Sequence, residues 1–180
     1  MKINFGKFKN RNIIIGKNNK MRPTQSMAKS IIFNLIKIND ETKVIDLFAG
    51  TGLLGFESMS LGACCVTWSD NNINSVNAIK KNIENFMLDD KKFKVFKTDF
   101  RLTLKNTSFK PNLIFLDPPF ISTKYYEEAL NIIYKKDLLE EDGIIVIEKP
   151  KKTSICFEDK FLLKNSRRLG DKDILILSRK

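Results

Sequence analysis

Residues 44–55 of this chain read VIDLFAGTGLLG, an apolar run that leads directly into a glycine-rich turn. The glycines have the spacing G-x-G-x-x-G, after an expected strand and at the start of an expected helix. Glycine there lets the backbone turn tightly and approach a ligand closely. Several cofactor classes share this spacing, so it predicts a nucleotide-containing cofactor without choosing one. In the structural alternative, the glycines only pack the helix on the strand.

Outward from this turn, strand and helix patterns alternate along the chain. We expect strands at 43–48, 63–69, 93–97, 112–117, 143–148, 154–163 and 172–178. We expect helices at 26–38, 53–61, 71–87, 101–105 and 125–136. Such alternation predicts an α/β fold with a mostly parallel sheet covered on both faces. The sheet would have seven strands and end in an antiparallel hairpin, whose turn lies at 169–171. Residues 3–15 read as a small, basic N-terminal β-hairpin.

The length of 180 residues fits one domain, which we divide into a basic extension (1–22) and a catalytic core (23–180). No apolar stretch approaches the roughly 20 residues that span a membrane, and the N-terminus lacks a secretory signal. Three cysteines suggest neither a disulfide framework nor a zinc ribbon. Cys64 and Cys65 are expected as buried strand residues. We therefore expect a cytoplasmic protein, and a monomer.

The chain contains no histidine. This excludes Ser-His-Asp and Cys-His catalysis and histidine-ligated zinc. An enzyme built from this sequence must use carboxylates, backbone groups and a reactive cofactor. We expect no metal site.

Positive charge is concentrated at the N-terminus. Residues 1–37 contain nine Lys or Arg and no Asp or Glu, which leaves +2 of the net +11 for the rest of the chain. A lysine-rich composition would explain many lysines, but it does not explain absent acids. The asymmetry favours a polyanionic partner, and we interpret it as a nucleic-acid-facing surface.

A second motif, DPPF at residues 117–120, closes the apolar run at 113–116. A carboxylate at a strand's C-terminal end lies where open α/β sheets bind ligands. Two prolines remove consecutive N–H donors, so the turn offers carbonyl acceptors, and Phe120 adds an aromatic face. These features predict a pocket for a planar group that carries an NH2. The alternative is a plain strand-ending turn.

The two motifs favour one cofactor class when they are combined. Asp70 lies about 20 residues after the glycine loop, where a carboxylate can reach a ribose hydroxyl. A dinucleotide and S-adenosylmethionine both fit, but no residue pattern resembles a hydride-transfer site. Asp117 and the Pro118 carbonyl can accept the two N–H bonds of a base amine and direct its lone pair at a methyl donor. Phe120 would stack on the base, and alignment replaces a strong general base.

At this point the chain resembles the bacterial 16S ribosomal RNA guanine-N2 methyltransferases, within the wider class of S-adenosylmethionine-dependent amino-methyltransferases. The resemblance covers nearly the whole chain. Its motifs are GKFKNR (6–11), RPT (22–24), DLFAGTG (46–52) and DPPF (117–120). The last motif alone is shared with DNA adenine-N6 and cytosine-N4 enzymes, but the combination is more specific. The resemblance implies a Rossmann-like methyltransferase fold.

The resemblance also implies roles for individual residues. The cofactor's methionine end would be held by Asp46, Phe48, Ala49, Gly50, Thr51 and Gly52, with Arg22 and Thr24 nearby. Asp70 would contact its ribose, and Asp99 its adenine amino group, with Phe100 beside it. The target base would occupy a catalytic pocket of Asp117, Pro118, Pro119 and Phe120. The N-terminal hairpin would bind RNA phosphates through Lys7, Lys9, Arg11, Lys17 and Lys20.

Two positions depart from the family pattern. Where the family has a Glu two positions before Asp70, this chain has Trp68, which has no carboxylate for a ribose hydroxyl. Either Asp70 takes over or cofactor affinity is lower, unless Trp68 is simply a strand residue packed under a helix. In addition, residues 25–29 lack the charged stretch that follows RPT in the family, which affects RNA contacts rather than the fold.

The resulting hypothesis is a methyltransferase that acts on a guanine N2 in ribosomal RNA, either naked or within a small-subunit particle. One rival is a DNA amino-methyltransferase, which normally carries a target-recognition insertion that is not visible here. Another is a non-catalytic RNA-binding ribosome-assembly factor on the same scaffold. A small oxidoreductase is a third, and it lacks hydride-site residues.

Overall fold

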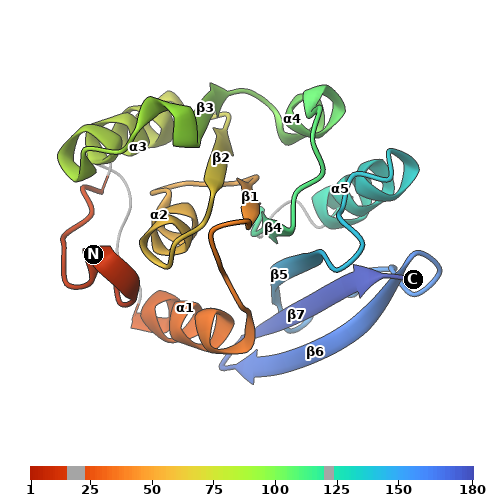
Figure 1. Cartoon of the computed structure of the whole chain (residues 1–180). Coiled ribbons are helices and arrows are strands. Elements are labelled where there is room, and N and C mark those ends of the chain that lie inside the picture. The colour runs from red at the N-terminus through yellow and green to blue at the C-terminus, as the bar shows by residue number, and fades with distance from the viewer. Residues whose placement is uncertain (16–22, 120–123) are drawn as a thin grey trace.

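The computed structural model describes residues 1–15, 23–119 and 124–180, with helices on both faces of one sheet (Figure 1). The strands are β1 (Lys43–Asp46), β2 (Cys65–Asp70), β3 (Phe93–Lys97), β4 (Leu113–Leu116), β5 (Ile144–Pro150), β6 (Phe161–Leu169) and β7 (Lys172–Arg179). The helices are α1 (Pro23–Leu35), α2 (Leu53–Ser60), α3 (Ile73–Phe86), α4 (Phe100–Asn106) and α5 (Lys124–Lys135), with short 3₁₀ turns η1 (Gly6–Phe8) and η2 (Asp90–Lys92). The expected α/β architecture is confirmed.

The seven-stranded sheet has the order β3-β2-β1-β4-β5-β7-β6. All neighbours are parallel except β7, which runs antiparallel to both β5 and β6. The order reverses between β1 and β4, where Ile45 lies opposite Ile114. Both residues are fully buried, as expected for central strands covered on two faces. The carboxyl ends of β1 and β4 therefore flank the switch point, where such sheets bind ligands.

Two apolar cores separate the sheet from its helices. One core lies under α1, α2 and α3 and contains Trp68 and Phe56; the other lies under α4 and α5 and contains Tyr126 and Phe100. Figure 1 shows the two helical layers on opposite faces of the sheet. Among the described residues, no helix is long and apolar enough to cross a membrane.

The N-terminal segment differs from the hairpin that the sequence predicts. Its two arms run antiparallel, but they share a single bridge between Lys2 and Asn12, and η1 occupies the loop between them. The buried carboxylate of Glu57 in α2 accepts the amide N–H groups of Asn4 (2.7 Å) and Phe5 (3.1 Å). Because these amides bind α2, they are not available for a regular strand ladder.

The expected strand at 154–163 is wrong in its first part, because β6 begins only at Phe161. Ile155 and Phe157 instead point into the core under α5, and the Glu127 carboxylate accepts the amide N–H of Cys156 (3.1 Å). The alternation of apolar and polar residues at 154–157 therefore comes from a loop with two side chains anchored in the core, and not from a strand. β6 itself is an edge strand whose side chains are mostly exposed, so its sequence carries little apolar signal.

Smaller differences concern element ends. α1 begins at Pro23 rather than Ser26. Proline suits the first turn of a helix, because the backbone N–H that it lacks would have no acceptor within the helix there. Cys64 is exposed and precedes β2, and Cys65 is half-buried at its start, so the expectation that both are buried strand residues is wrong.

Candidate active site

Three neighbouring strands bring a carboxylate to the same edge of the sheet. Asp46 ends β1, Asp117 follows β4, and Glu148 lies near the end of β5. Two cavities of about 180 and 380 Å³ open at this edge. Phe48, Gly50 and Asp117 line both of them. The edge is the one that the switch point of the sheet predicts for a ligand.

The glycine-rich loop is a tight turn held by the carboxylate of Asp70. The Gly52 amide N–H donates to the Ala49 carbonyl (2.6 Å), and Gly50 has a left-handed φ of 52°. Asp70 accepts the amide N–H groups of Gly50 (2.7 Å) and Asn72 (2.8 Å), one on each oxygen. Asp70 also lines the larger cavity. Each carboxylate oxygen has a second lone pair, so binding the loop leaves acceptor capacity for a ligand hydroxyl.

Trp68 packs beneath this loop and lines neither cavity. Its side chain is fully buried, its ring lies 4.6 Å from that of Phe56, and its Nε1 donates to the Gly52 carbonyl (3.0 Å). A Cβ at Gly55 would lie 2.1 Å from Nε1, so glycine is needed there. The interpretation of Trp68 as a packed strand residue is confirmed, and it supports the loop by a hydrogen bond from below.

Asp46 lies under the start of α2, where its carboxylate accepts the Gly55 amide N–H (3.3 Å). Burial raises the pKa of Asp46 to about 7, with a smaller upward contribution from the negative charge of Asp70; the Gly55 hydrogen bond opposes both. Asp46 therefore changes charge near neutral pH at the wall of the smaller cavity.

Asp117 shares its surroundings with a buried ion pair. Lys172, from the start of β7, binds the carboxylate of Glu148, and both side chains are almost fully buried. Burial raises the pKa of Asp117 well above its ordinary value; the charge of Glu148 raises it further, whereas Lys172 lowers it. Of the prolines, Pro118 is buried and Pro119 is exposed. The Tyr126 hydroxyl donates to the Glu148 carbonyl (2.9 Å), which fixes the end of β5 against α5.

Aromatic rings form one wall of the larger cavity. The ring of Phe48 is nearly parallel to that of Tyr125, with centroids 6.1 Å apart, and lies 5.0 Å from the ring of Phe100. The Arg101 guanidinium lies over the rings of Phe100 and Tyr125, at 4.6 and 5.0 Å from their centroids. This wall offers flat apolar surfaces to a planar ligand.

Asp99 begins α4 as its N-cap residue. One carboxylate oxygen accepts the Arg101 amide N–H (2.9 Å), and the other pairs with the Arg101 guanidinium (2.9 Å). Arg101 also pairs with Glu128 of α5 (2.5 Å), which joins the two helices beside the cavity. The structure thus places Asp99 and Phe100 together at the larger cavity.

The remaining predicted site residues divide into four groups. Ala49 and Thr51 line the smaller cavity, and Gly52 is packed against Phe56 and Ile79. Thr24 belongs to the first turn of α1. Lys7, Lys9 and Arg11 are exposed and do not line either cavity. Outside the described residues lie Lys17, Lys20, Arg22 and Phe120.

Sequence reasoning missed Glu148, Lys172 and Tyr125. Glu148 had a usable signal, because it is the third acid to follow an apolar strand at the same sheet edge. Tyr125 lies in the first turn of α5, just after the proline motif, and could have been recognised by that position. Lys172 had no such signal, because its place depends on the antiparallel register of β7 with β5.

Comparisons with known proteins find relatives over most of this chain. A family model described as Conserved hypothetical protein 95 matches residues 1–178. YlbH of Bacillus subtilis, which carries a provisional name as an rRNA methyltransferase, is 32% identical over 86% of this chain and 85% of its own. The Ribosomal RNA small subunit methyltransferase D of Haemophilus influenzae is 28% identical over 83% and 79%. The solved structure of Escherichia coli yhhF has a TM-score of 0.86 at 22% identity and covers 100% of this chain and 98% of that one.

Proposed function

Because this chain belongs to the family described as Conserved hypothetical protein 95, we propose that it is an S-adenosylmethionine-dependent methyltransferase that acts on a guanine N2 in 16S ribosomal RNA. One observation carries the proposal. The glycine-rich loop and the Asp117-Pro118-Pro119 turn line two adjoining cavities that share Asp117. A cofactor that extends along both cavities would therefore have its methyl group beside the turn that binds the amine acceptor.

The residues present fit the cofactor. At Gly50 a Cβ would have only the Phe48 carbonyl within 4 Å, so the backbone faces open space in the cavity. Residues 49–52 would hold the methionine end, Asp70 the ribose, and Asp99 with Phe100 the adenine. Asp70 and Asp99 keep lone pairs for these contacts after their protein hydrogen bonds are counted. When bound, S-adenosylmethionine supplies an already activated methyl group.

The chain's own residues orient the acceptor and manage its proton. The ionised Asp117 carboxylate accepts one N–H of the base amine, and the Pro118 carbonyl accepts the other. This arrangement holds the nitrogen lone pair toward the donor, while Phe48 and Tyr125 pack against flat ligand surfaces. The amine loses one proton on methylation, and the raised pKa of Asp117 suits it to take up that proton.

We further propose that the protein acts as a monomer in the cytoplasm, on naked ribosomal RNA or on a small-subunit particle. Lys7, Lys9 and Arg11 contact RNA phosphates at the N-terminal segment, with Lys17 and Lys20. Arg22 and Thr24 approach the methionine part of the cofactor, and Phe120 stacks on the target base.

The test is to map N2-methylguanine in ribosomal RNA from cells with and without this protein. We expect loss of methylation at a defined 16S guanine, restored by the wild-type gene and not by an Asp117→Asn variant. An unchanged ribosomal RNA pattern would refute the RNA assignment. Loss of methylated adenine or cytosine in DNA would support the DNA alternative instead.

A further inference from the structure

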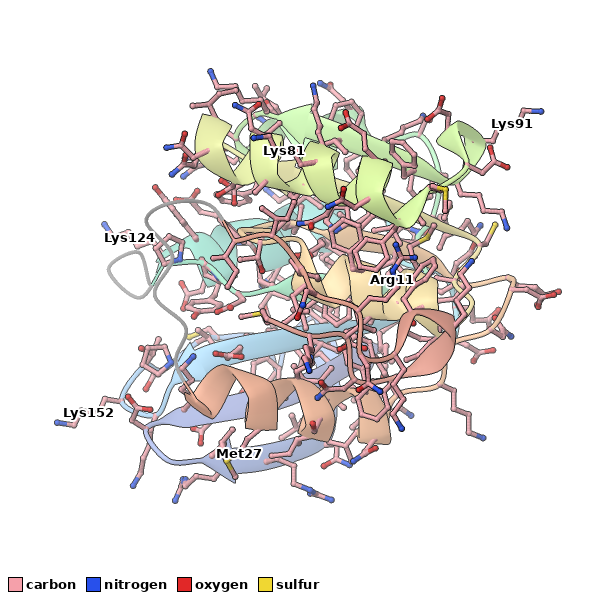
Figure 2. The ribbon with its side chains drawn as sticks, turned by 90° about the vertical axis from the view of Figure 1, so that its left-hand side faces the viewer. Arg11, Met27, Lys81, Lys91, Lys124 and Lys152 are labelled. Carbon is pink, nitrogen blue, oxygen red and sulfur yellow. The ribbon has the colours of Figure 1, made fainter. Side chains whose placement is uncertain are left out.

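Exposed cations from the C-terminal half of the chain lie at the same edge of the sheet as the larger cavity. Lys124 opens α5, Lys151 and Lys152 follow β5, and Arg167 lies near the end of β6. The end of β5 and the end of β6 lie at the sheet edge that holds Asp117, and Tyr125 at the start of α5 lines the same cavity as Asp117. In Figure 2, Lys124 and Lys152 project from the same side of the molecule.

We infer that Lys124, Lys151, Lys152 and Arg167 form a second RNA-binding surface, here called the rim, which contacts phosphates beside the target nucleotide. This inference rests on the proposed function and adds the location of the RNA to it. A base that reaches Asp117 leaves its own backbone at the cavity mouth. Cations at that mouth are therefore the ones that can neutralise the adjacent phosphates.

The backbone presents Lys151 and Lys152 on an ordered turn. The Thr153 amide N–H donates to the Pro150 carbonyl (2.9 Å), which closes the turn. The Lys151 amide N–H donates to the carbonyl of Asp171 in the β6–β7 connection (2.8 Å). The two lysines thus sit on a fixed support beside the start of β7, and little backbone ordering is left for the moment of binding.

The acids of the neighbouring strands are bound by other cations. Asp173 is bound by Lys149 (3.1 Å) and Arg168 (3.3 Å), and Glu148 is bound by Lys172. Within the described part of the chain, none of the four rim side chains forms an ion pair. Lys149, Arg168 and Lys172 therefore bind acids of the fold, and the four rim cations are left for a polyanion.

Lys7, Lys9 and Arg11 lie on the loop at the far end of α2, whereas Met1 and Ile15 of the same segment line the smaller cavity. The Ser60 hydroxyl, at the C-terminal end of α2, accepts the Phe8 amide N–H (2.8 Å). Arg11 donates to the Asn85 carbonyl (2.5 Å) near the end of α3. α2 begins at the cavity and is about 12 Å long, so the loop that carries these residues is separated from Asp117 by the length of the helix. Lys7, Lys9 and Arg11 therefore lie on a separate surface from the rim.

The test compares two matched pairs of adjacent, exposed lysines. Lys151→Gln/Lys152→Gln removes two charges from the rim, and Lys91→Gln/Lys92→Gln removes two from η2, at the opposite end of the sheet. Figure 2 places Lys152 and Lys91 at opposite sides of the molecule. Binding of each purified protein is measured from 50 to 200 mM salt. The probe is full-length 16S RNA or the small-subunit particle, whichever the wild type methylates.

For the rim variant we expect the slope of log affinity against log salt to fall by about 0.7–0.9 per lysine that contacts a phosphate. The control variant should keep the wild-type slope, and both should bind S-adenosylmethionine and unfold thermally as the wild type does. Equal slopes for the rim and control variants would overturn the inference while leaving the proposed function intact. A wild type that methylates neither probe would instead be a failure of the proposed function.

Discussion

The ammonium group of Lys172 forms a buried ion pair with the carboxylate of Glu148, beside Asp117. The pair links the start of β7 to the end of β5 at the wall of the acceptor pocket. Because Glu148 raises the pKa of Asp117 and Lys172 lowers it, the two charges act on Asp117 in opposite directions. Burial is the largest cause of the raised pKa of Asp117. Because Lys172 opposes Glu148, the ion pair adds less to that pKa than Glu148 would alone.

This relationship predicts opposite shifts in the pH dependence of methyl transfer. Lys172→Met should raise the pKa of Asp117 further and move the acidic limb of the rate profile to higher pH. Glu148→Gln should move the limb to lower pH. Single-turnover rates between pH 5 and 9 measure both shifts.

The double variant Glu148→Gln/Lys172→Met is the control. It should lie between the single variants, and it should be more stable than either, because each single change leaves an unpaired buried charge that costs about 3–5 kcal/mol. Coincident profiles for the wild type, the two single variants and the double variant would show that the Glu148–Lys172 pair does not affect the pKa of Asp117.

The raised pKa of Asp46 predicts that the stability of the cofactor-free protein depends on pH. Its pKa is raised from 3.8 to about 7, so between those values the folded protein holds a proton that the unfolded chain has lost. Stability from this residue is complete at low pH and falls as pH rises toward 7. Asp46→Asn should flatten this decline by up to about 4 kcal/mol between pH 4 and 8. Urea unfolding at several pH values measures it, and an identical decline in the variant would contradict the assignment.

Gly55 is predicted to be intolerant of any side chain. A methyl group there would lie 2.1 Å from Trp68 Nε1, so Gly55→Ala must displace the indole and its hydrogen bond to the Gly52 carbonyl. We expect a loss of about 1–3 kcal/mol and weaker cofactor binding, measured by thermal unfolding and calorimetry. Adding Trp68→Phe should recover part of the stability in the Gly55→Ala background. No recovery would mean that the clash is elsewhere.

Glu57 is predicted to anchor the N-terminal segment. Its carboxylate pairs with buried Lys29 (2.6 Å) in addition to binding the amides of Asn4 and Phe5. Glu57→Gln leaves Lys29 without its counter-charge and should cost about 3–5 kcal/mol, with faster hydrogen exchange in residues 2–13. Ser60→Ala removes one side-chain anchor on the same helix, a smaller loss of about 1–3 kcal/mol. Equal exchange in the two variants would contradict the leading role of Glu57.

The parts of the site that sequence predicted are those with a local cause. The turn at Gly50 and Gly52 depends on backbone conformations that glycine adopts, and Asp117 follows directly from a buried strand and precedes two prolines. Asp99 is similar, because it caps the helix that comes next in the chain. In each case the residue and its structural reason lie within a few positions of each other.

The parts that sequence missed depend on long-range contacts. Lys172 reaches Glu148 only through the register of β7 on β5. The N-terminal segment does not form the predicted hairpin, because Glu57, in a helix distant in sequence, binds its amide N–H groups. Trp68 stayed ambiguous because a strand position does not reveal whether a side chain faces a ligand or a helix. The structure shows that Trp68 faces α2, where its ring packs against that of Phe56.

The most direct test of the account is methylation of 16S RNA, or of the small-subunit particle, by purified protein and S-adenosylmethionine labelled in its methyl group. Nucleoside analysis then identifies the product. The account predicts labelled N2-methylguanine with the wild type. Asp117→Asn should show at least a hundred-fold slower transfer, on the order of the contribution of one positioned proton-accepting group, while its affinity for the cofactor is unchanged. Comparable turnover in Asp117→Asn, or label in any other nucleoside, would contradict it.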